Sequence, residues 1–135
     1  MIEPKPRYGT KKAIEELAKE LNLQHEESMQ DWPYEVANPD DIEKYIAHYQ
    51  LTSDEDKKFL LMEVILQATN DQNQRTDVEK YWNEIKQLLI DDFLIHEYSV
   101  FYWSCFKDKN LDNCWTITPY MRQLWADKHG KTGQL

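Results

Sequence analysis

Apolar residues recur three and four positions apart along most of the chain, which is the spacing of amphipathic helices. The clearest example follows Thr76-Asp77-Val78-Glu79, a capping-box sequence that predicts a helix start. The apolar positions of that helix are Val78, Tyr81, Trp82, Ile85, Leu88 and Leu89. A similar stripe predicts a helix over 11–21, opened by Thr10 as the capping residue. The chain is therefore predicted to be all-α, with five to six helices.

Two further helix starts combine a capping side chain with carboxylates. Asn38-Pro39-Asp40-Asp41 places a cap, a proline suited to the first helical position and two acids at the positive end of the helix dipole. Thr52 or Ser53 caps the next helix, whose first turn holds Asp54, Glu55 and Asp56. The broad apolar set between Phe59 and Ala68 predicts that this second helix is central and well buried.

Residues 93–106 are rich in aromatic and β-branched side chains, which strands also favour. Their polar positions do not alternate, and fourteen residues are long for a strand, so a buried helix is favoured. A short β-hairpin within 98–117 remains the alternative. Thr118-Pro119 then predicts the start of the last helix.

The length of 135 residues fits one domain. We expect a flexible arm over 1–9, a single helical domain over 10–127 and a frayed tail over 128–135. Glycine occurs only at Gly9, Gly130 and Gly133. This distribution disfavours an all-β fold and leaves no glycine-rich loop to cradle phosphates.

The formal net charge is −9, and residues 31–72 carry ten acidic side chains against three basic ones. Such a chain repels the phosphate backbone, so nucleic acid is not an expected partner. A basic protein is the complementary expectation, because opposite fields speed encounter and disfavour wrong partners. The alternative is that the acidic charge serves only solubility.

The chain begins without an apolar signal segment, and no stretch is apolar enough to cross a membrane. A cytoplasmic protein is therefore expected. Cys105 and Cys114 could pair if a turn brought them together, but free thiols are the favoured prediction in a reducing compartment.

No complete catalytic, metal-binding or cofactor-binding set is recognisable, and none is predicted. The four histidines lie in no metal-ligand motif, and no serine lies in a nucleophile elbow. An enzyme of unrecognised class would draw on Glu63, His96 or Asp92 in a helical pocket. A third hypothesis is a self-associating structural protein, and the oligomeric state is left open.

Binding is the favoured role, and two sets of residues are candidates for it. The predicted partner-binding carboxylates are Asp40, Asp41, Glu43, Asp54, Glu55 and Asp56, for which helix capping is the competing explanation. The second set, Trp103, Trp115 and Tyr120, would form an aromatic interface, although aromatic residues on helices more often belong to the core. Arg122 stands among apolar neighbours and is expected to pair with an internal carboxylate.

Four stretches carry a resemblance to small acidic bacterial proteins of toxin–immunity loci. They are residues 31–39 (Asp-Trp-Pro-Tyr-Glu-Val-Ala-Asn-Pro), residues 61–65 (Leu-Met-Glu-Val-Ile), and Tyr102-Trp103-Ser104 together with residues 116–122 (Thr-Ile-Thr-Pro-Tyr-Met-Arg). The resemblance covers most of the chain after Lys11. It implies a cytoplasmic inhibitor that blocks a cognate toxin, often a nuclease with a basic active-site surface.

Overall fold

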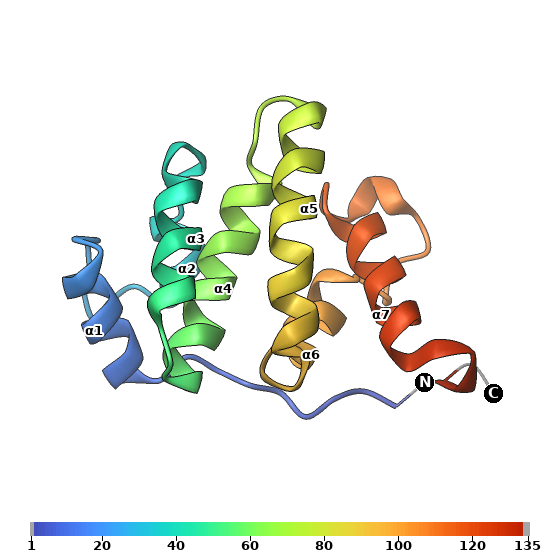
Figure 1. The fold of residues 1–135 in the computed structure, drawn as a ribbon, viewed down its shortest axis with the longest axis horizontal. Coiled ribbons are helices and arrows are strands. Elements are labelled where there is room, and N and C mark those ends of the chain that lie inside the picture. The colour runs from blue at the N-terminus through green and yellow to red at the C-terminus, as the bar shows by residue number, and fades with distance from the viewer. Residues whose placement is uncertain (1, 134–135) are drawn as a thin grey trace. The chain divides into compact units, whose positions relative to one another are not determined.

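A computed structural model describes residues 2–133, which contain seven α-helices, two short 3-10 helices and no strand (Figure 1). The prediction of an all-α fold is confirmed. The elements are α1 (Lys11–Glu20), α2 (Trp32–Val36), η1 (Pro39–Asp41), α3 (Ile42–Leu51), α4 (Glu55–Asn70), α5 (Arg75–Asp91), α6 (Phe93–Trp103), η2 (Leu111–Asn113) and α7 (Thr118–Gly133).

Thr10 and Asn38 cap the helix starts that they mark in the sequence, whereas α4 is capped by Asp54 and not by the predicted Thr52 or Ser53. The predicted cap Thr76 lies inside α5, which begins at Arg75. Thr10 Oγ1 accepts a hydrogen bond from the backbone N–H of Ala13 at 3.1 Å. Asn38 Oδ1 accepts from Asp40 N at 3.0 Å, and Asp54 Oδ1 accepts from Lys57 N at 2.9 Å. Each bond satisfies an amide that the first turn of a helix leaves without an internal partner.

The helix α2 lies in a stretch where apolar residues do not recur at helical spacing, so the sequence pattern does not predict it. Its five residues begin at Trp32-Pro33, and the proline stands in the first turn. The Trp32 ring is buried, and its Nε1–H donates to the carbonyl of Gln24 at 2.7 Å. One large buried side chain therefore fixes a segment too short to show a helical period.

Residues 98–117 form no hairpin. The helix α6 continues to Trp103, and the chain then turns through η2 before α7 begins. The helical interpretation of this region is confirmed as far as Trp103. Beyond it the structure has a loop where the sequence pattern extended the helix to residue 106.

The chain divides into two compact units. We call Tyr8–Gln74 the α1–α4 unit, and Met1–Arg7 together with Arg75–Leu135 the α5–α7 unit. In the α1–α4 unit, α1, α2 and α3 all pack on α4 (Figure 1). Every residue of α4 from Phe59 to Leu66 is buried, as its broad apolar set predicts.

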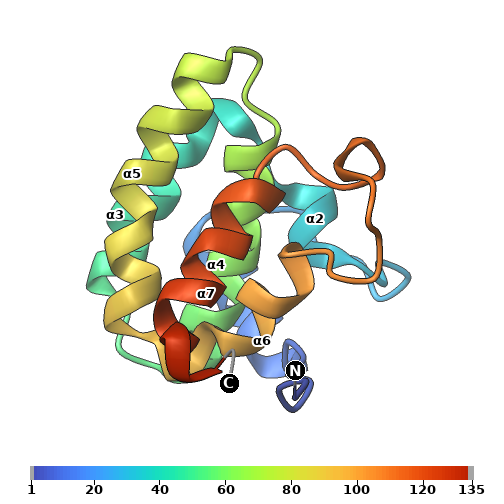
Figure 2. The ribbon, with the colours of Figure 1, turned by 90° about the vertical axis from the view of Figure 1, so that its right-hand side faces the viewer.

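In the α5–α7 unit, α6 packs against both α5 and α7 (Figure 2). The buried side chains of this unit are Val78, Trp82, Ile85, Leu89, His96, Ser99, Val100, Trp103, Ser104, Ile117, Thr118, Met121, Leu124 and Trp125. The helix α7 is interrupted at Gly130, whose φ of 60° lies in the left-handed region that glycine adopts without a Cβ clash.

The boundaries predicted for one helical domain, with an arm over 1–9 and a tail over 128–135, stay a prediction. No helix or strand is present in residues 2–10, while α7 runs on to Gly133. Positions 134–135 of the predicted tail lie outside the described residues. None of the helices within 2–133 combines the length and the apolar character that a bilayer-spanning segment needs.

Candidate functional site

The charge of the chain is divided unequally between the two units. The α1–α4 unit holds fifteen acidic and six basic side chains, a net charge of −9. The α5–α7 unit holds ten of each and is neutral. The whole formal charge of the protein therefore belongs to residues 8–74.

The six predicted carboxylates form two groups, one at each end of α4. Gln72, just beyond the C-terminal end of α4, donates from Nε2 to the carbonyl of Pro39 at 2.9 Å, which places η1 and Asp40 at that end. Asp54 caps the opposite end. The sixteen residues of α4 span about 24 Å at 1.5 Å per residue, so the two groups do not form one cluster.

The lysines of the same region are engaged by neighbouring residues. Lys44 Nζ donates to the carbonyl of Leu21 at 3.2 Å, and Lys57 pairs with Glu20. The ammonium of Lys58 lies 5.5 Å from the centre of the Tyr49 ring. Asp40, Glu43, Asp54, Glu55 and Asp56 are exposed, and so is Lys44. Because residues 31–72 hold ten acidic and three basic side chains, the field of this region is negative.

The outer face of α3 connects the two acidic groups. Its exposed positions follow the helical repeat and comprise Glu43, Lys44, Ala47, Gln50 and Leu51. Leu51 is 85% exposed and lies three residues before Asp54. Along α3, Ala47 and the exposed Leu51 therefore lie between Glu43 on one side and Asp54 on the other.

Glu20 ties three helices of the α1–α4 unit together. Its carboxylate pairs with Lys57 of α4 and receives His48 Nε2 of α3 at 2.7 Å. The hydrogen bond from Lys57, followed by the contribution of His48, holds the pKa of the Glu20 carboxyl below its usual 4.5, against the opposing effect of burial. Glu20, although exposed, is thus a structural acid that links α1 to α3 and α4.

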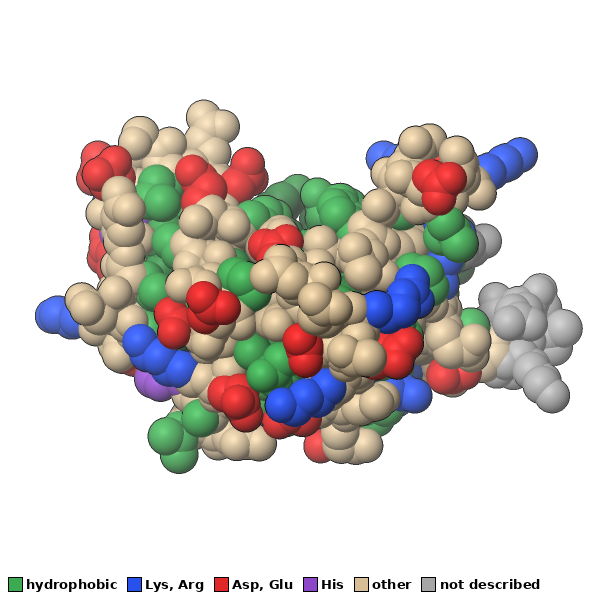
Figure 3. All heavy atoms as spheres, turned by 90° about the horizontal axis from the view of Figure 1, so that it is seen from above, with side chains coloured by type: hydrophobic (Ala, Val, Ile, Leu, Met, Phe, Trp, Pro, Cys, Tyr) green, Lys and Arg blue, Asp and Glu red, His purple; other side chains and the backbone are tan. Residues whose placement is uncertain are grey.

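Acidic side chains are also distributed across the surface. On the face drawn in Figure 3, carboxylates lie among basic and uncharged side chains and are not gathered in one cluster. Recognition of a partner by this charge would therefore act through a broad field and several contacts.

The three predicted interface aromatics occupy different environments in the α5–α7 unit. Trp103 is buried, whereas Trp115 is half-buried and packs on Trp103 with ring centres 4.8 Å apart. Tyr102 stacks on Trp115 at 5.2 Å and is 42% exposed. Tyr120 stacks instead on Trp82, with ring centres 5.5 Å apart. These ring contacts therefore connect Trp103 with Trp115 but do not connect either of them with Tyr120.

The two cysteines form a disulfide, and this corrects the prediction of free thiols. The turn after α6 brings the Cα atoms of Cys105 and Cys114 to 6.1 Å, which is within the usual range for a disulfide. Cys105 itself has a φ of 54°, an uncommon backbone conformation for a residue other than glycine. The nine-residue separation gave no sign that a tight turn would follow Trp103.

Arg122 provides a second correction, because its partners are backbone carbonyls. Nε donates to the carbonyl of Ser104 at 2.6 Å, and Nη2 donates to those of Cys105 and Asp108 at 2.8 and 3.0 Å. The loop after α6 turns these carbonyls toward α7, where the five guanidinium donors can bind several at once. The expected internal carboxylate is replaced by this set.

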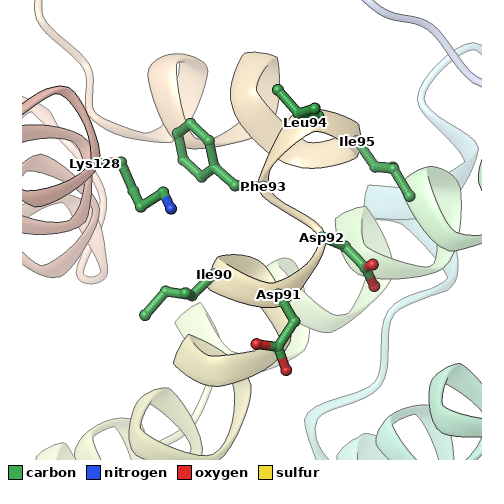
Figure 4. Close-up of a pocket in the computed structure, with 7 residues that line it drawn as sticks. All are labelled: Ile90, Asp91, Asp92, Phe93, Leu94, Ile95 and Lys128. Carbon is green, nitrogen blue, oxygen red and sulfur yellow. The ribbon is translucent and has the colours of Figure 1, made fainter.

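A shallow pocket of about 460 Å³ lies at the corner between α5 and α6 (Figure 4). Phe93 and Lys128 lie on one side of it, with the ammonium 5.3 Å from the ring centre, while Asp91 and Asp92 lie near the corner of the chain (Figure 4). Leu94 on its rim is 89% exposed. The lining contains no nucleophile with an adjacent base, so this pocket does not indicate a reaction.

Glu63 and His96, two of the residues considered for an enzymatic role, are both buried. Glu63 is buried in the α1–α4 unit and accepts a hydrogen bond from the Tyr34 hydroxyl at 2.9 Å. His96 is buried in α6, and its backbone N–H donates to the carbonyl of Asp92 at 3.2 Å. Within residues 2–133, His, Cys, Asp and Glu side chains nowhere gather in the groups of three that a metal site needs.

No family model, curated protein or solved structure matches this chain. Sequence reasoning missed the disulfide and the role of Arg122. Arg122 stood out only as a lone cation among apolar residues, and its carbonyl partners are invisible in a sequence. The Glu20 contact with α3 and α4 was likewise missed, because its partners lie 28 and 37 residues away.

Proposed function

We propose that this protein is a binding protein of the inhibitor or immunity type, whose α1–α4 unit docks on a basic protein. The observation that carries the proposal is the charge partition: a net −9 in residues 8–74 beside a neutral α5–α7 unit. Charge needed only for solubility has no reason to be confined to half of a chain.

The chemistry of the surface favours a cationic protein that also offers some apolar area. The exposed carboxylates at both ends of α4 would pair with Lys and Arg, while Ala47 and Leu51 would contact apolar side chains between them. A nuclease fits this description as a target class, because a surface that binds the phosphate backbone is basic. Covering that surface with carboxylates would block it.

The cytoplasm is part of the same proposal. The resemblance to proteins of toxin–immunity loci supports it, since an inhibitor must meet its toxin inside the producing cell. The disulfide weighs against it, because stable disulfides are rare in the cytosol. A disulfide that opens and closes would be compatible with both.

Charge reversal with a matched control tests the proposed surface. One variant carries Asp40→Lys, Glu43→Lys, Glu55→Lys and Asp56→Lys, and it spares the capping residue Asp54. The control carries Glu3→Lys, Glu84→Lys, Asp112→Lys and Asp127→Lys, the same change of charge in the neutral unit. Each protein, together with the wild type, serves as bait for a lysate of its source cells.

We expect a basic partner to be retained by the wild type and the control and lost from the variant reversed in the α1–α4 unit. Circular dichroism of both variants serves to check that they keep their helices. Equal retention by all three baits, or loss from both variants alike, would contradict the proposed surface. The absence of any retained basic protein would contradict the function.

A further inference from the structure

We propose that the Cys105–Cys114 disulfide is a redox-sensitive clasp that controls the loop between α6 and α7. In the oxidised protein the loop is closed and Trp115 is held against Trp103. A dithiol reductant opens the clasp and releases the second half of the loop, from Lys109 to Cys114. The helices on either side stay in place.

The first half of the loop is anchored independently of the disulfide. Arg122 of α7 binds the carbonyls of Ser104, Cys105 and Asp108, and Ser104 Oγ also donates to the carbonyl of Val100 at 2.7 Å. These four bonds continue the end of α6 into the loop and fix it on α7. None of them needs the sulfur–sulfur bond.

The second half of the loop has a different set of attachments. Its backbone bonds are local, from Asn113 N to the carbonyl of Asn110 and from Cys114 N to that of Leu111, both at 3.0 Å. Side-chain bonds to the first half run through the carboxylate of Asp108, including one of 3.4 Å from Asn113 Nδ2. Residues 109–113 are exposed, so water competes for these contacts.

The disulfide is therefore the strongest link between the two halves. It closes a loop of about ten residues, and such a cross-link stabilises mainly by removing conformations from the open state. When it breaks, the exposed segment regains that freedom, while Arg122 still holds the segment before it. Local opening of this kind involves few buried contacts and leaves the rest of a fold intact.

The surroundings of the sulfurs favour one direction of exchange. Both cysteines are half-buried, so a small thiol can reach them. Arg122 Nη2 lies 3.9 Å from Cys114 Sγ, where its charge stabilises a departing thiolate. A thiolate of the reductant thus attacks Cys105 Sγ, the sulfur–sulfur bond breaks, and Cys114 leaves as the thiolate.

The second thiol of the reductant completes the exchange. Once deprotonated, it attacks the reductant's own sulfur in the mixed disulfide and displaces Cys105 as a thiolate. The reductant gains one disulfide and loses two electrons, and the protein gains two electrons. The protons that the reductant's thiols lose become available to the two cysteine thiolates, so atoms and charges balance.

The consequence concerns the aromatic surface. Trp115 follows Cys114 directly, and its ring packs between Trp103 and Tyr102 at 4.8 and 5.2 Å. Its backbone N–H donates to Thr118 Oγ1 at 3.1 Å. Opening the clasp removes the restraint immediately before Trp115, so the exposure of Trp115 and Tyr102 changes with the redox state.

Limited proteolysis tests the clasp, because Lys109 is an exposed trypsin site in the half that reduction releases, whereas the exposed Lys107 lies in the half that Arg122 anchors. The wild-type protein is digested with and without dithiothreitol, and cleavage at each of the two lysines is followed by mass spectrometry. We expect reduction to speed cleavage at Lys109 by roughly tenfold or more and to change cleavage at Lys107 much less. Helicity by circular dichroism should be unchanged.

The matched control is a Cys105→Ser, Cys114→Ser variant, which should be cleaved rapidly whether or not dithiothreitol is present. If that variant fails to fold, the comparison of the oxidised and reduced wild type still decides. Equal cleavage of the two forms would overturn the proposal. So would free thiols that resist oxidation by glutathione disulfide, or a loss of helicity on reduction, which would make the disulfide a staple of the whole fold.

Discussion

The two units of this protein differ in net charge and in their share of aromatic residues. The α1–α4 unit carries all of the net charge and six of the seventeen aromatic residues, whereas the α5–α7 unit is neutral and holds the other eleven. In the first, exposed carboxylates lie at both ends of α4, whose buried residues are mostly aliphatic. In the second, rings pack on rings, and a disulfide and an arginine hold the loop. In the proposed function, partner recognition belongs to the charged α1–α4 unit, and the α5–α7 unit has no net charge to contribute to it.

The largest effect should come from a cavity in the aromatic core of the α5–α7 unit. Trp103→Ala removes a ring that is buried and contacts Trp115 and Tyr102. We expect the free energy of unfolding to fall by about 3–5 kcal/mol, measured by urea denaturation. Leu94→Ala, at a position 89% exposed, is the control and should cost less than about 0.5 kcal/mol. A small loss in the Trp103 variant would show that stability is not concentrated in these rings.

A smaller effect is expected from the capping carboxylate of α4. Asp54→Ala removes the bond from Lys57 N and should lower the free energy of unfolding by about 1 kcal/mol. Glu55→Ala, whose carboxylate caps nothing, should cost clearly less. If both substitutions were equally costly, the distinction between capping and partner-facing acids in this unit would fail.

The smallest effect concerns the ion pair that Glu20 forms in the same unit. Glu20 has a pKa below its ordinary value in the folded chain, so its contribution is present at neutral pH and is lost as the pH falls through the folded pKa. Because the carboxylate is about a third exposed, Glu20→Gln should cost only about 0.5 kcal/mol at pH 7. Denaturation of both proteins from pH 7 to pH 3 should show the difference vanish at the acid end. A difference that persists at pH 3 would contradict the assigned cause.

The sequence predicted the helical class because periodicity and capping are local. Thr10 and Asn38 each predict a helix start within four residues, and each caps one, while the cap of α4 is Asp54, just after the predicted Thr52 or Ser53. The helix α2 escaped because five residues are too few to show a period, and its anchor is a tertiary contact from Trp32 to Gln24. The disulfide escaped because it depends on how sharply the chain turns after Trp103.

The candidate site could be predicted only in its composition. The six carboxylates proposed for binding lie at two helix starts close together in the sequence, whereas the structure sets them in two groups at opposite ends of α4. The partners of the lysines near these carboxylates could not be predicted from the sequence. Lys44 binds the carbonyl of Leu21 and Lys57 pairs with Glu20, in both cases more than twenty residues earlier in the chain. The partners of Arg122 could not be predicted either. Every residue has a backbone carbonyl, so the sequence does not show which carbonyls accept its hydrogen bonds.

The most direct test of docking through the acidic α1–α4 unit is the affinity of the captured partner as a function of salt concentration. We predict that the dissociation constant of the wild-type complex rises steeply between about 50 and 500 mM salt, where screening shortens from over 10 Å to a few ångströms. The variant with four carboxylates reversed in the α1–α4 unit should bind weakly at all salt concentrations, while the control reversed in the α5–α7 unit should follow the wild type. An affinity that is independent of salt, or equal in the two variants, would contradict the account.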